Sequence, residues 1–584
     1  MKLNYDKKSK DPSYFIQVGI RNGNKTTTKN VKRIGKHSEL LTITDDPLTY
    51  AKNQVEEFNK EYKEGKIDMS FKIDFNEKLT ATENIASKSA LLNVGYFILQ
   101  KIYQSLKVHD FFASIQDNSK ITFDCNTVNR FLTFSRILDP KSKLGTFDRL
   151  DSYYEQPSFG YQHILRFMDV LEENYDSYLE HLFINSGNIV KRNTSVCYFD
   201  CTNYYFESED EDDEYIDEAT GEILKGLRRY GPSKEHRPNP IVQMGLFIDG
   251  NGIPISMCIN SGSDNEQKCA VPLEQKITTL FKGKPFIYCA DAGLGSFNIR
   301  KFNSMGGRAF IVTQSVKKLS DKLQEAVFND YDYRRISDNS SITIKHMKEF
   351  NRYEQENLSL YNDTVYKILN ADRPVDVGLY EEKVLKNGKS RMVKSKGVLK
   401  QKIIVTFSRK MMEYQRHIRN AQIERAKNIL ITKDVEDIKK GPHDVTRFIK
   451  RTSTGKDGEK ASDLYEIDQS VIDKEEKYDG YYAVATNLED DAKVILEINS
   501  RRYKIEEYRL LENKLDQYGT HFSTENILET LRNMNVINTQ DAFYTATHKG
   551  SQVCTSLNGV FNLGLDKKYY LPKELNKKIK KILR

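Results

Sequence analysis

One segment limits the possible folds of this chain more than any other, because it has the pattern of a strand but carries an acid. In Val196 to Glu207 (VCYFDCTNYYFE) successive side chains alternate between two faces, and both faces are mostly apolar or aromatic. This pattern is typical of a strand that is covered on both sides. Asp200 lies in the middle of one face. Because burial of an unpaired carboxylate costs several kcal/mol, we expect Asp200 to have an arginine, a proton or a metal ion as its partner.

The segments after this strand predict a mixed α/β core. Two further strands, PIVQMGLFID and IPISMCIN, are joined by Gly250-Asn251-Gly252, which is a hairpin signal. A helix, a buried strand that ends at Asp291, a short helix and a last strand follow in that order. This order is that of a ribonuclease-H-like core, an α/β fold in which the first and fourth strands lie side by side. Asp200 and Asp291 should therefore face each other across adjacent strands.

Two carboxylates at that separation repel each other, so one must take a proton or a divalent cation must lie between them. Hard oxygen ligands on a rigid sheet suit Mg²⁺ or Mn²⁺ better than zinc. A pair of such ions about 3.5–4 Å apart could activate a water or hydroxyl and stabilise the leaving oxygen of a phosphodiester. Taken singly, each aspartate is more often a turn or cap residue. Together, in this strand order, the two acids favour a catalytic site.

A third carboxylate should come from a helix on this sheet. We interpret Lys318 to Glu476 as a β-rich insertion, after which the core resumes with a strand, YDGYYAVATN, and a long helix over residues 491–515. Arg502, Glu506 and Arg509 share one face of that helix, four and three residues apart. They could serve a metal site beside a phosphate chain or form an ordinary surface ladder of ion pairs, and the spacing alone favours the ladder.

Composition argues against several classes of protein. No segment has the apolar length of a membrane span, and the N-terminus is charged where a secretory signal would be apolar. The seven cysteines include no Cys-x-x-Cys pair, which argues against a disulfide framework or a structural zinc and favours a reducing cytosol. The net charge of +7 is unevenly distributed, with an acidic run in ESEDEDDEYIDEATGE and basic runs at 383–402 and 573–584. This segregation indicates a polyanionic partner, or simply solvated loops.

The pattern along the chain predicts six regions. They are an N-terminal β/helix head (1–82), a helical region for nucleic-acid binding or dimerisation (83–193), the first part of the core (194–317), the β-rich insertion (318–476), the second part of the core (477–515) and a C-terminal basic helical region (516–584).

Four segments together resemble one protein family: VCYFDCTNYYFE, GPSKEHRPNPIVQMGLFIDGNGIPISMCINSGSDNEQ, ADAGLGS and INSRRYKIEE. They are similar to the DDE-type insertion-sequence transposases, in the insertion-sequence-four superfamily and its sixteen-thirty-four group. The resemblance covers nearly the whole chain. It implies that Asp200, Asp291 and Glu506 are the catalytic residues and metal ligands, with two Mg²⁺ or Mn²⁺ ions as cofactors. It also implies a β-rich insertion before Glu506.

The function that the resemblance implies is that of a DNA transposase. Such an enzyme binds the terminal inverted repeats of its insertion sequence, then cleaves and transfers strands by metal-dependent phosphoryl transfer. Its partners would be those repeats, target DNA and a second copy of the chain in a synaptic complex, in the bacterial cytosol with the nucleoid. The alternatives are a ribonuclease-H-like nuclease that does not transfer strands, and a transposase relic that binds DNA with impaired catalysis.

Six basic residues are candidate contacts to DNA: Lys234, His236, Arg237, Arg502, Arg509 and Lys514. The first three lie in SKEHRP, which could equally be a loop anchored by its proline. Arg502 could hold a phosphate beside the predicted catalytic glutamate.

The chain departs from the family pattern directly after Glu507. Family members continue into Phe-Arg, a Lys and an Arg-Pro-Val turn, whereas here Glu507 is followed by Tyr508 and no proline occurs before Pro572. This difference predicts an internal deletion that removes the usual phosphate-facing lysine and part of a helix on the sheet. Lys514 lies one residue away from the family's usual offset from the glutamate. Activity of the shortened chain therefore needs a direct measurement.

Overall fold

The chain forms two compact units, which are described one at a time. In this computed structural model the described residues are 1–22, 25–64, 91–216, 221, 223–224, 226–384, 390–432, 444–454, 462–502, 509–539 and 542–583. The first unit comprises Met1–Lys191 and Glu507–Arg584, and the second comprises Arg192–Glu506. Glu506 and the predicted deletion after Glu507 lie outside the described residues.

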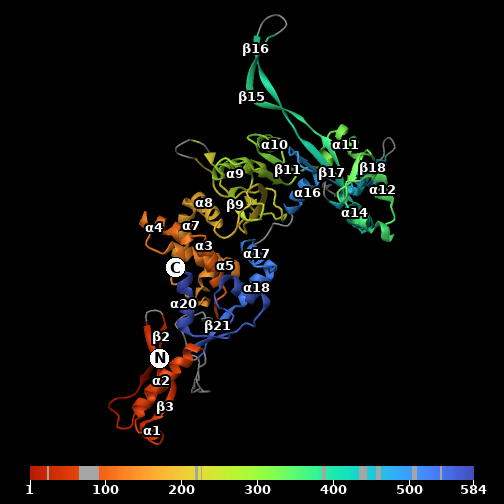
Figure 1. The fold of residues 1–584 in the computed structure, drawn as a ribbon. Coiled ribbons are helices and arrows are strands. Elements are labelled where there is room, and N and C mark those ends of the chain that lie inside the picture. Colours follow the sequence, from red (N-terminus) through yellow and green to blue (C-terminus); the bar gives the residue numbers. More distant parts are fainter. Residues whose placement is uncertain are drawn as a thin grey trace. The chain divides into compact units, whose positions relative to one another are not determined.

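A ten-stranded mixed sheet is the centre of the second unit (Figure 1). In spatial order its strands are β13 (Ser341–Ile342), β12 (Tyr333–Arg335), β14 (Val365–Asn370), β17 (Lys402–Phe407), β20 (Tyr481–Thr486), β11 (Ala309–Thr313), β10 (Ile287–Ala290), β5 (Val196–Tyr205), β8 (Ile241–Asp249) and β9 (Pro254–Ser261).

The strands that carry the two aspartates are neighbours, as predicted. β10 runs parallel to β5 on one side and to β11 on the other, whereas β8 and β9 pair antiparallel beyond β5. The predicted hairpin between β8 and β9 is present, and Gly252 in its turn has a left-handed φ of 80°. Asp249, which is fully buried, accepts a hydrogen bond from Asn251 N at 2.9 Å and so closes the turn.

Helices cover both faces of this part of the sheet. α16 (Ala492–Arg501) packs on one face, where the Tyr198 hydroxyl donates to the Ile498 carbonyl at 2.9 Å. On the other face the Cys201 thiol donates to the Glu266 carbonyl at 3.8 Å, at the start of α9 (Glu266–Leu280). Asn265 caps α9 by accepting a hydrogen bond from Gln267 N at 2.9 Å. The shorter α10 (Phe297–Phe302) packs against α9.

The segment interpreted as an insertion contributes to the same sheet. Four of its strands, β12, β13, β14 and β17, extend the sheet beyond β20. The remainder forms a long two-stranded hairpin, β15 (Arg373–Val384) with β16 (Ser390–Leu399), which extends away from the sheet (Figure 1). It also contains α11 (Asp321–Phe328), α12 (Ile344–Glu349), α13 (Leu358–Asn362), α14 (Arg409–Thr432), β18 (Ile449–Thr454), β19 (Ser462–Ile467) and α15 (Gln469–Glu476). Outside this segment, a second small hairpin consists of β6 (Tyr215–Ile216), in the acidic run, and β7 (Ile223–Leu224), directly after it.

The first unit begins with the small β/helix head that the sequence predicts. Its sheet consists of β1 (Lys2–Asn4), β2 (Ser13–Asn22) and β3 (Lys25–Lys36), followed by α1 (His37–Leu40) and α2 (Pro47–Glu64). Ile16 and Val31 from this sheet pack against Val55 and Phe58 of α2 in one apolar cluster.

The rest of the first unit has one core built from both ends of the chain. The N-terminal share is β4 (Leu91–Asn93), α3 (Tyr96–Ser105), α4 (Val108–Asp117), α5 (Cys125–Leu138), α6 (Lys143–Phe147), α7 (Tyr161–Glu173) and α8 (Tyr175–Ser186). The C-terminal share is α17 (Arg509–Gln517), α18 (Thr524–Asn533), β21 (Asn535–Thr539), β22 (Phe543–Ala546), α19 (Gln552–Phe561), β23 (Tyr569–Tyr570) and α20 (Pro572–Ile582). The predicted helical C-terminal region therefore also holds strands, because β21 pairs with β4 from the other end of the chain.

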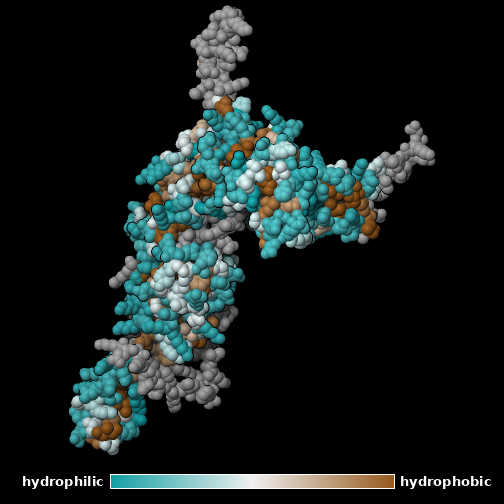
Figure 2. Space-filling model, turned by 45° about the vertical axis from the view of Figure 1, so that its right-hand side comes forward, coloured by the Kyte–Doolittle hydropathy of each residue, from teal (hydrophilic) through white to brown (hydrophobic). Residues whose placement is uncertain are grey.

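Hydrophilic side chains predominate on the face of the molecule that Figure 2 shows, and hydrophobic side chains gather there in separate small areas. Among the described helices, none combines the length and the apolar character that a membrane crossing requires.

Candidate functional site

The two predicted aspartates occupy matching positions on neighbouring parallel strands. The register of β5 and β10 pairs Cys289 with Tyr198, and Asp291 and Asp200 each follow two residues later. Parallel strands lie about 4.8 Å apart, and residues in register point to the same face. The two carboxylates therefore lie side by side at the carboxyl end of β10.

Asp200 is exposed, and the expectation that it is buried is wrong. The first four residues of β5 are buried, but the strand reaches the surface at Asp200, and Asp291 is half-buried. Among the described residues no lysine or arginine forms an ion pair with either aspartate, so the arginine that was one of three possible partners is not found there. Water can therefore solvate both carboxylates, and neither acid needs a buried partner.

The loop after β10 is held in place from several sides. Asp291 Oδ1 accepts a hydrogen bond from Leu294 N at 3.0 Å. Gln267 of α9 donates from Nε2 to the Gly293 carbonyl at 2.7 Å, and the buried Tyr288 hydroxyl donates to the Leu294 carbonyl at 3.1 Å. These contacts join the strand, the loop and the first turn of α9. They give the Asp291 carboxylate a defined position without using both of its oxygens.

The end of α16 lies on the face of the sheet to which both aspartates point. Tyr198, which bonds to Ile498, shares its face of β5 with Asp200. Burial raises the pKa of the Cys289 thiol to about 12, and the positive charge of Arg502 opposes that rise. Cys289 shares its face of the chain with Asp291, so Arg502 brings positive charge to the side of the sheet that carries the acids.

The predicted third ligand, Glu506, lies outside the described residues, so the structure does not place it. Within the described part of the chain, no three histidine, cysteine, aspartate or glutamate side chains gather closely enough to hold a metal ion. The described site is accordingly a pair of carboxylates. α16, which precedes Glu506 in the sequence, packs on the same face of the sheet.

The SKEHRP segment contacts the second half of β5, which begins directly after Asp200. Lys234 donates from Nζ to the Cys201 carbonyl and lies 3.7 Å from Glu266 Oε1. The guanidinium of Arg237 stacks 4.4 Å from the centre of the Tyr205 ring. His236 is exposed and has a left-handed φ of 55°. The structure thus brings Lys234 close to the acid-bearing strand, and it leaves His236 and Arg237 accessible to solvent.

The two remaining basic candidates, Arg509 and Lys514, belong to α17 in the first unit. The side chain of Arg509 lies outside the described residues, and Lys514 is half-buried. They therefore belong to a different unit from the two aspartates.

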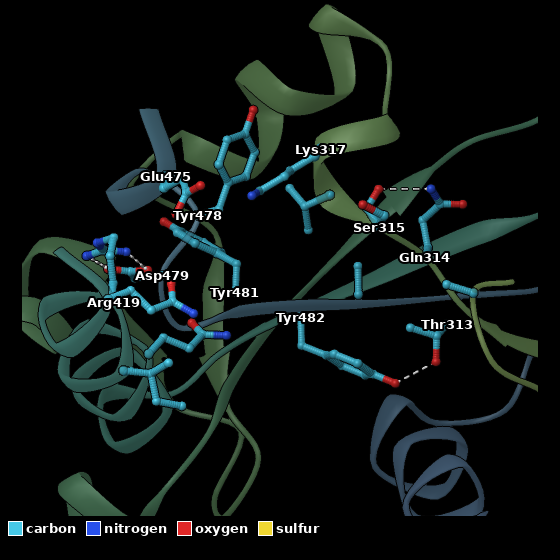
Figure 3. A pocket seen from close by; sticks show the side chains of 16 residues that line it. Thr313, Gln314, Ser315, Lys317, Arg419, Glu475, Tyr478, Asp479, Tyr481 and Tyr482 are labelled. Atoms are coloured by element: carbon cyan, nitrogen blue, oxygen red, sulfur yellow. Dashed lines mark hydrogen bonds and ion pairs between the residues drawn. The ribbon is translucent and has the colours of Figure 1, made fainter. Parts of the chain in front are cut away.

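Two cavities lie where the loop after β10 meets the end of β11, and sequence reasoning missed the residues that line them. Both cavities are lined by Ala292, directly after Asp291, and by residues 313–315 at the end of β11. Figure 3 shows the larger one, of about 410 Å³, where the Thr313 and Tyr482 hydroxyls lie 2.7 Å apart. The sequence did predict the strand that became β11, and β11 runs parallel to β10. Residues just beyond the carboxyl ends of parallel strands commonly form ligand sites, so the residues after this strand were candidates.

Comparisons with known proteins add little to this description. No family profile matches the chain, and no curated protein matches it. One solved structure that does match is a cryo-electron-microscopy structure of a piggyBac transposase synaptic complex with hairpin DNA. The sequence identity is 11%, the match covers 84% of this chain and 83% of that chain, and the TM-score is 0.27. A TM-score this low does not establish a shared fold.

Proposed function

We propose that this protein is a DNA transposase that cleaves and transfers strands by metal-dependent phosphoryl transfer. The observation that carries the proposal is that Asp200 on β5 and Asp291 directly after β10 each follow the paired residues Tyr198 and Cys289 by two positions on adjacent parallel strands. The strand order β11-β10-β5-β8-β9, with parallel pairing only around β10, is the order expected of a ribonuclease-H-like core. The motif resemblance to insertion-sequence transposases supports the same assignment.

The donor set suits a hard divalent cation. Two carboxylates side by side, with no described cation paired to them, leave a concentration of negative charge that Mg²⁺ or Mn²⁺ would relieve. Asp200 and Asp291 would hold the ions together with Glu506, which the sequence predicts as the third ligand. When bound, two such ions supply activation of the attacking oxygen and neutralisation of charge on the phosphate.

The residues around the acid pair have separate tasks in this proposal. The Gln267 and Tyr288 contacts hold the loop after β10, so the Asp291 carboxylate is positioned before DNA arrives. Arg502 would bind a DNA phosphate on the acid-bearing face, and Lys234 and Arg237 would contact the DNA backbone beyond β5. Two copies of the chain would bind the terminal inverted repeats together in a synaptic complex.

Two other functions remain in competition. A ribonuclease-H-like nuclease would use the same acids but would not join strands, and a relic would bind DNA without cutting it. Strand transfer with pre-cut DNA ends separates the transposase from the nuclease. Nicking in Mn²⁺ separates both enzymes from the relic.

The central test replaces each acid by its amide. We expect Asp200→Asn and Asp291→Asn each to lower plasmid nicking in Mg²⁺ by about a thousandfold or more, because the carboxylates hold the catalytic charge. DNA affinity, measured by fluorescence anisotropy in the absence of divalent ions, should change by less than about threefold, since phosphate contacts come from other residues. Glu506→Gln should behave in the same way.

Asp490→Asn is the matched control, because it makes the same change at an exposed side chain before α16. It should nick like the unaltered protein. If either acid-pair variant nicks as fast as this control, the catalytic site lies elsewhere.

A further inference from the structure

The smaller of the two cavities at the end of β11 has a strongly polar lining. Its volume is about 250 Å³, and its walls come from α9, the loop after β10, α10, the end of β11 and the first residue of β15. The lining includes Gln267, Ala292, Gln314, Arg300, Lys318 and Arg373. Hydroxyls, amides and three cationic groups predominate in the lining, and no carboxylate is among its residues.

The three cations differ in how firmly they are held. Lys318 and Arg373 are exposed, and Arg373 also stacks 5.1 Å from the centre of the Phe297 ring. Arg300 is only 9% exposed. The cavity therefore has one buried cation in its wall, Arg300, and two exposed cations at its rim, Lys318 and Arg373.

Arg300 is held entirely by neutral acceptors. Its Nε donates to the Gly295 carbonyl at 2.9 Å, and its two terminal nitrogens donate to Gln314 Oε1 at 2.7 Å and Gln401 Oε1 at 3.3 Å. Burial and the charge of Arg373 lower the pKa of Arg300 to about 10, which still leaves it charged at neutral pH. Because these acceptors are amide oxygens, the charge of Arg300 is not neutralised within its wall.

The larger neighbouring cavity lacks this imbalance. There Arg419 bonds to both carboxylate oxygens of Asp479, at 2.7 and 2.6 Å (Figure 3). Glu475 lines the same cavity and forms an ion pair with Arg447 at 2.9 Å, so the larger cavity has carboxylates as well as cations in its lining. The excess positive charge thus belongs to the smaller cavity and marks it as a site for an anion.

The position of the cavity connects it to the acid pair. Ala292 lines it and follows Asp291 directly, and Gln267 reaches from its wall to the loop that holds Asp291. The cavity and Asp291 therefore share the loop after β10.

We propose that this cavity binds a backbone phosphate of the DNA strand that is cleaved at Asp200 and Asp291. The inference rests on the proposed function, since it assumes DNA at the acid pair. The volume is below the roughly 300–1,000 Å³ of pockets for drug-sized ligands, which suits a phosphodiester and part of a sugar better than a whole nucleotide. Arg300 sets the charge of the wall, and Lys318 and Arg373 close on the phosphate from the rim.

The test uses the two exposed cations, whose removal should not disturb folding. We would measure the affinity of the full chain for a labelled 20-nucleotide single strand by anisotropy over a series of salt concentrations, without divalent ions. Arg373→Gln with Lys318→Gln should make the slope of log affinity against log salt shallower by about 0.7, the value for one phosphate of single-stranded DNA. The control pair, Arg334→Gln with Lys345→Gln, removes two exposed cations near the far edge of the sheet, around β12 and α12. It should leave the slope unchanged, and thermal unfolding should confirm that both pairs are folded.

An equal slope for the cavity variant and the control would overturn the inference. If, in that case, millimolar inorganic phosphate protects the unaltered chain from unfolding but not the cavity variant, the cavity binds free phosphate and not DNA. Nicking is measured separately, so failure of the proposed function remains distinguishable: a shallower slope with no nicking by the unaltered chain keeps the DNA site and removes the enzyme.

Discussion

At the scale of single residues, Glu274 is a carboxyl group in a fully buried position. It lies in α9 with no exposed surface, and burial raises its pKa from 4.5 to about 7. Asn303 Nδ2 donates to Glu274 Oε2 at 2.9 Å, but Glu274 Oε1 and Asn303 Oδ1 have no partner among the described residues. A protonated Glu274 could donate from its second oxygen to Asn303 Oδ1. The neutral form therefore suits this position better than the charged form.

The raised pKa of Glu274 predicts how stability changes with pH. Between pH 4.5 and about 7 the folded chain keeps a proton on Glu274 that the unfolded chain releases, so the free energy of unfolding falls as pH rises through this range. Glu274→Gln removes this dependence and should stabilise the protein relative to the unaltered chain at pH 8, by up to roughly 3 kcal/mol. Thermal unfolding at pH 5 and pH 8 measures the difference. Glu325→Gln, at an exposed position on α11, is the control, and an equal pH response in both variants would contradict the assignment.

At the scale of elements, a buried ion pair fastens α14 to the sheet. Arg419 of α14 and Asp479, just before β20, are 5% and 6% exposed, and they form two parallel hydrogen bonds. Removal of one partner from such a pair leaves an uncompensated buried charge. The pair also forms one wall of the larger cavity, so its loss should disturb that wall as well as overall stability.

This ion pair gives a direct test of how α14 is attached. Arg419→Met should lower the free energy of unfolding by about 3–5 kcal/mol, because Asp479 would remain buried without its main partner. Arg416→Met is the matched control: Arg416 lies on the same helix, is 43% exposed and contacts the same aspartate at 3.4 Å. Its loss should cost less than about 1 kcal/mol. Chemical denaturation of both variants would settle the comparison, and equal losses would show that the buried geometry is not what matters.

At the scale of the whole molecule, the net charge of +7 and its uneven distribution predict strongly salt-dependent DNA binding. We expect contributions from the N-terminal head, the helical region before Arg192 and the basic insertion. Each phosphate neutralised on duplex DNA adds about −0.9 to the slope of log affinity against log salt, so several contacts should give a slope steeper than about −3. Titration of a labelled duplex at four or more salt concentrations measures it. A slope near zero would remove DNA as the partner.

The acid pair shows how far sequence reasoning reached. Alternation in β5 and the order of the following segments predicted two strands and their adjacency, and both were confirmed. The burial of Asp200 was predicted wrongly. Alternation shows which residues share a face of a strand, but it does not show at which residue the strand stops being covered by helices and becomes exposed to solvent. The six residues around Glu506 lie outside the described part of the chain, so the predicted third ligand stays a prediction.

The sequence by itself determined the local features: the strand around Asp200, the hairpin at residues 250–252 and the capped helix that begins after Asn265. These depend on neighbours a few residues apart, so periodicity and turn chemistry suffice to predict them. Only the tertiary structure decided which distant segments meet. It placed Arg300, Lys318 and Arg373 around one cavity, and it paired β4 with β21 across more than 400 residues of chain. Such contacts depend on which distant segments pack together and which strands pair. The alternating pattern of one strand is compatible with many partner strands, so a local pattern does not identify the partner.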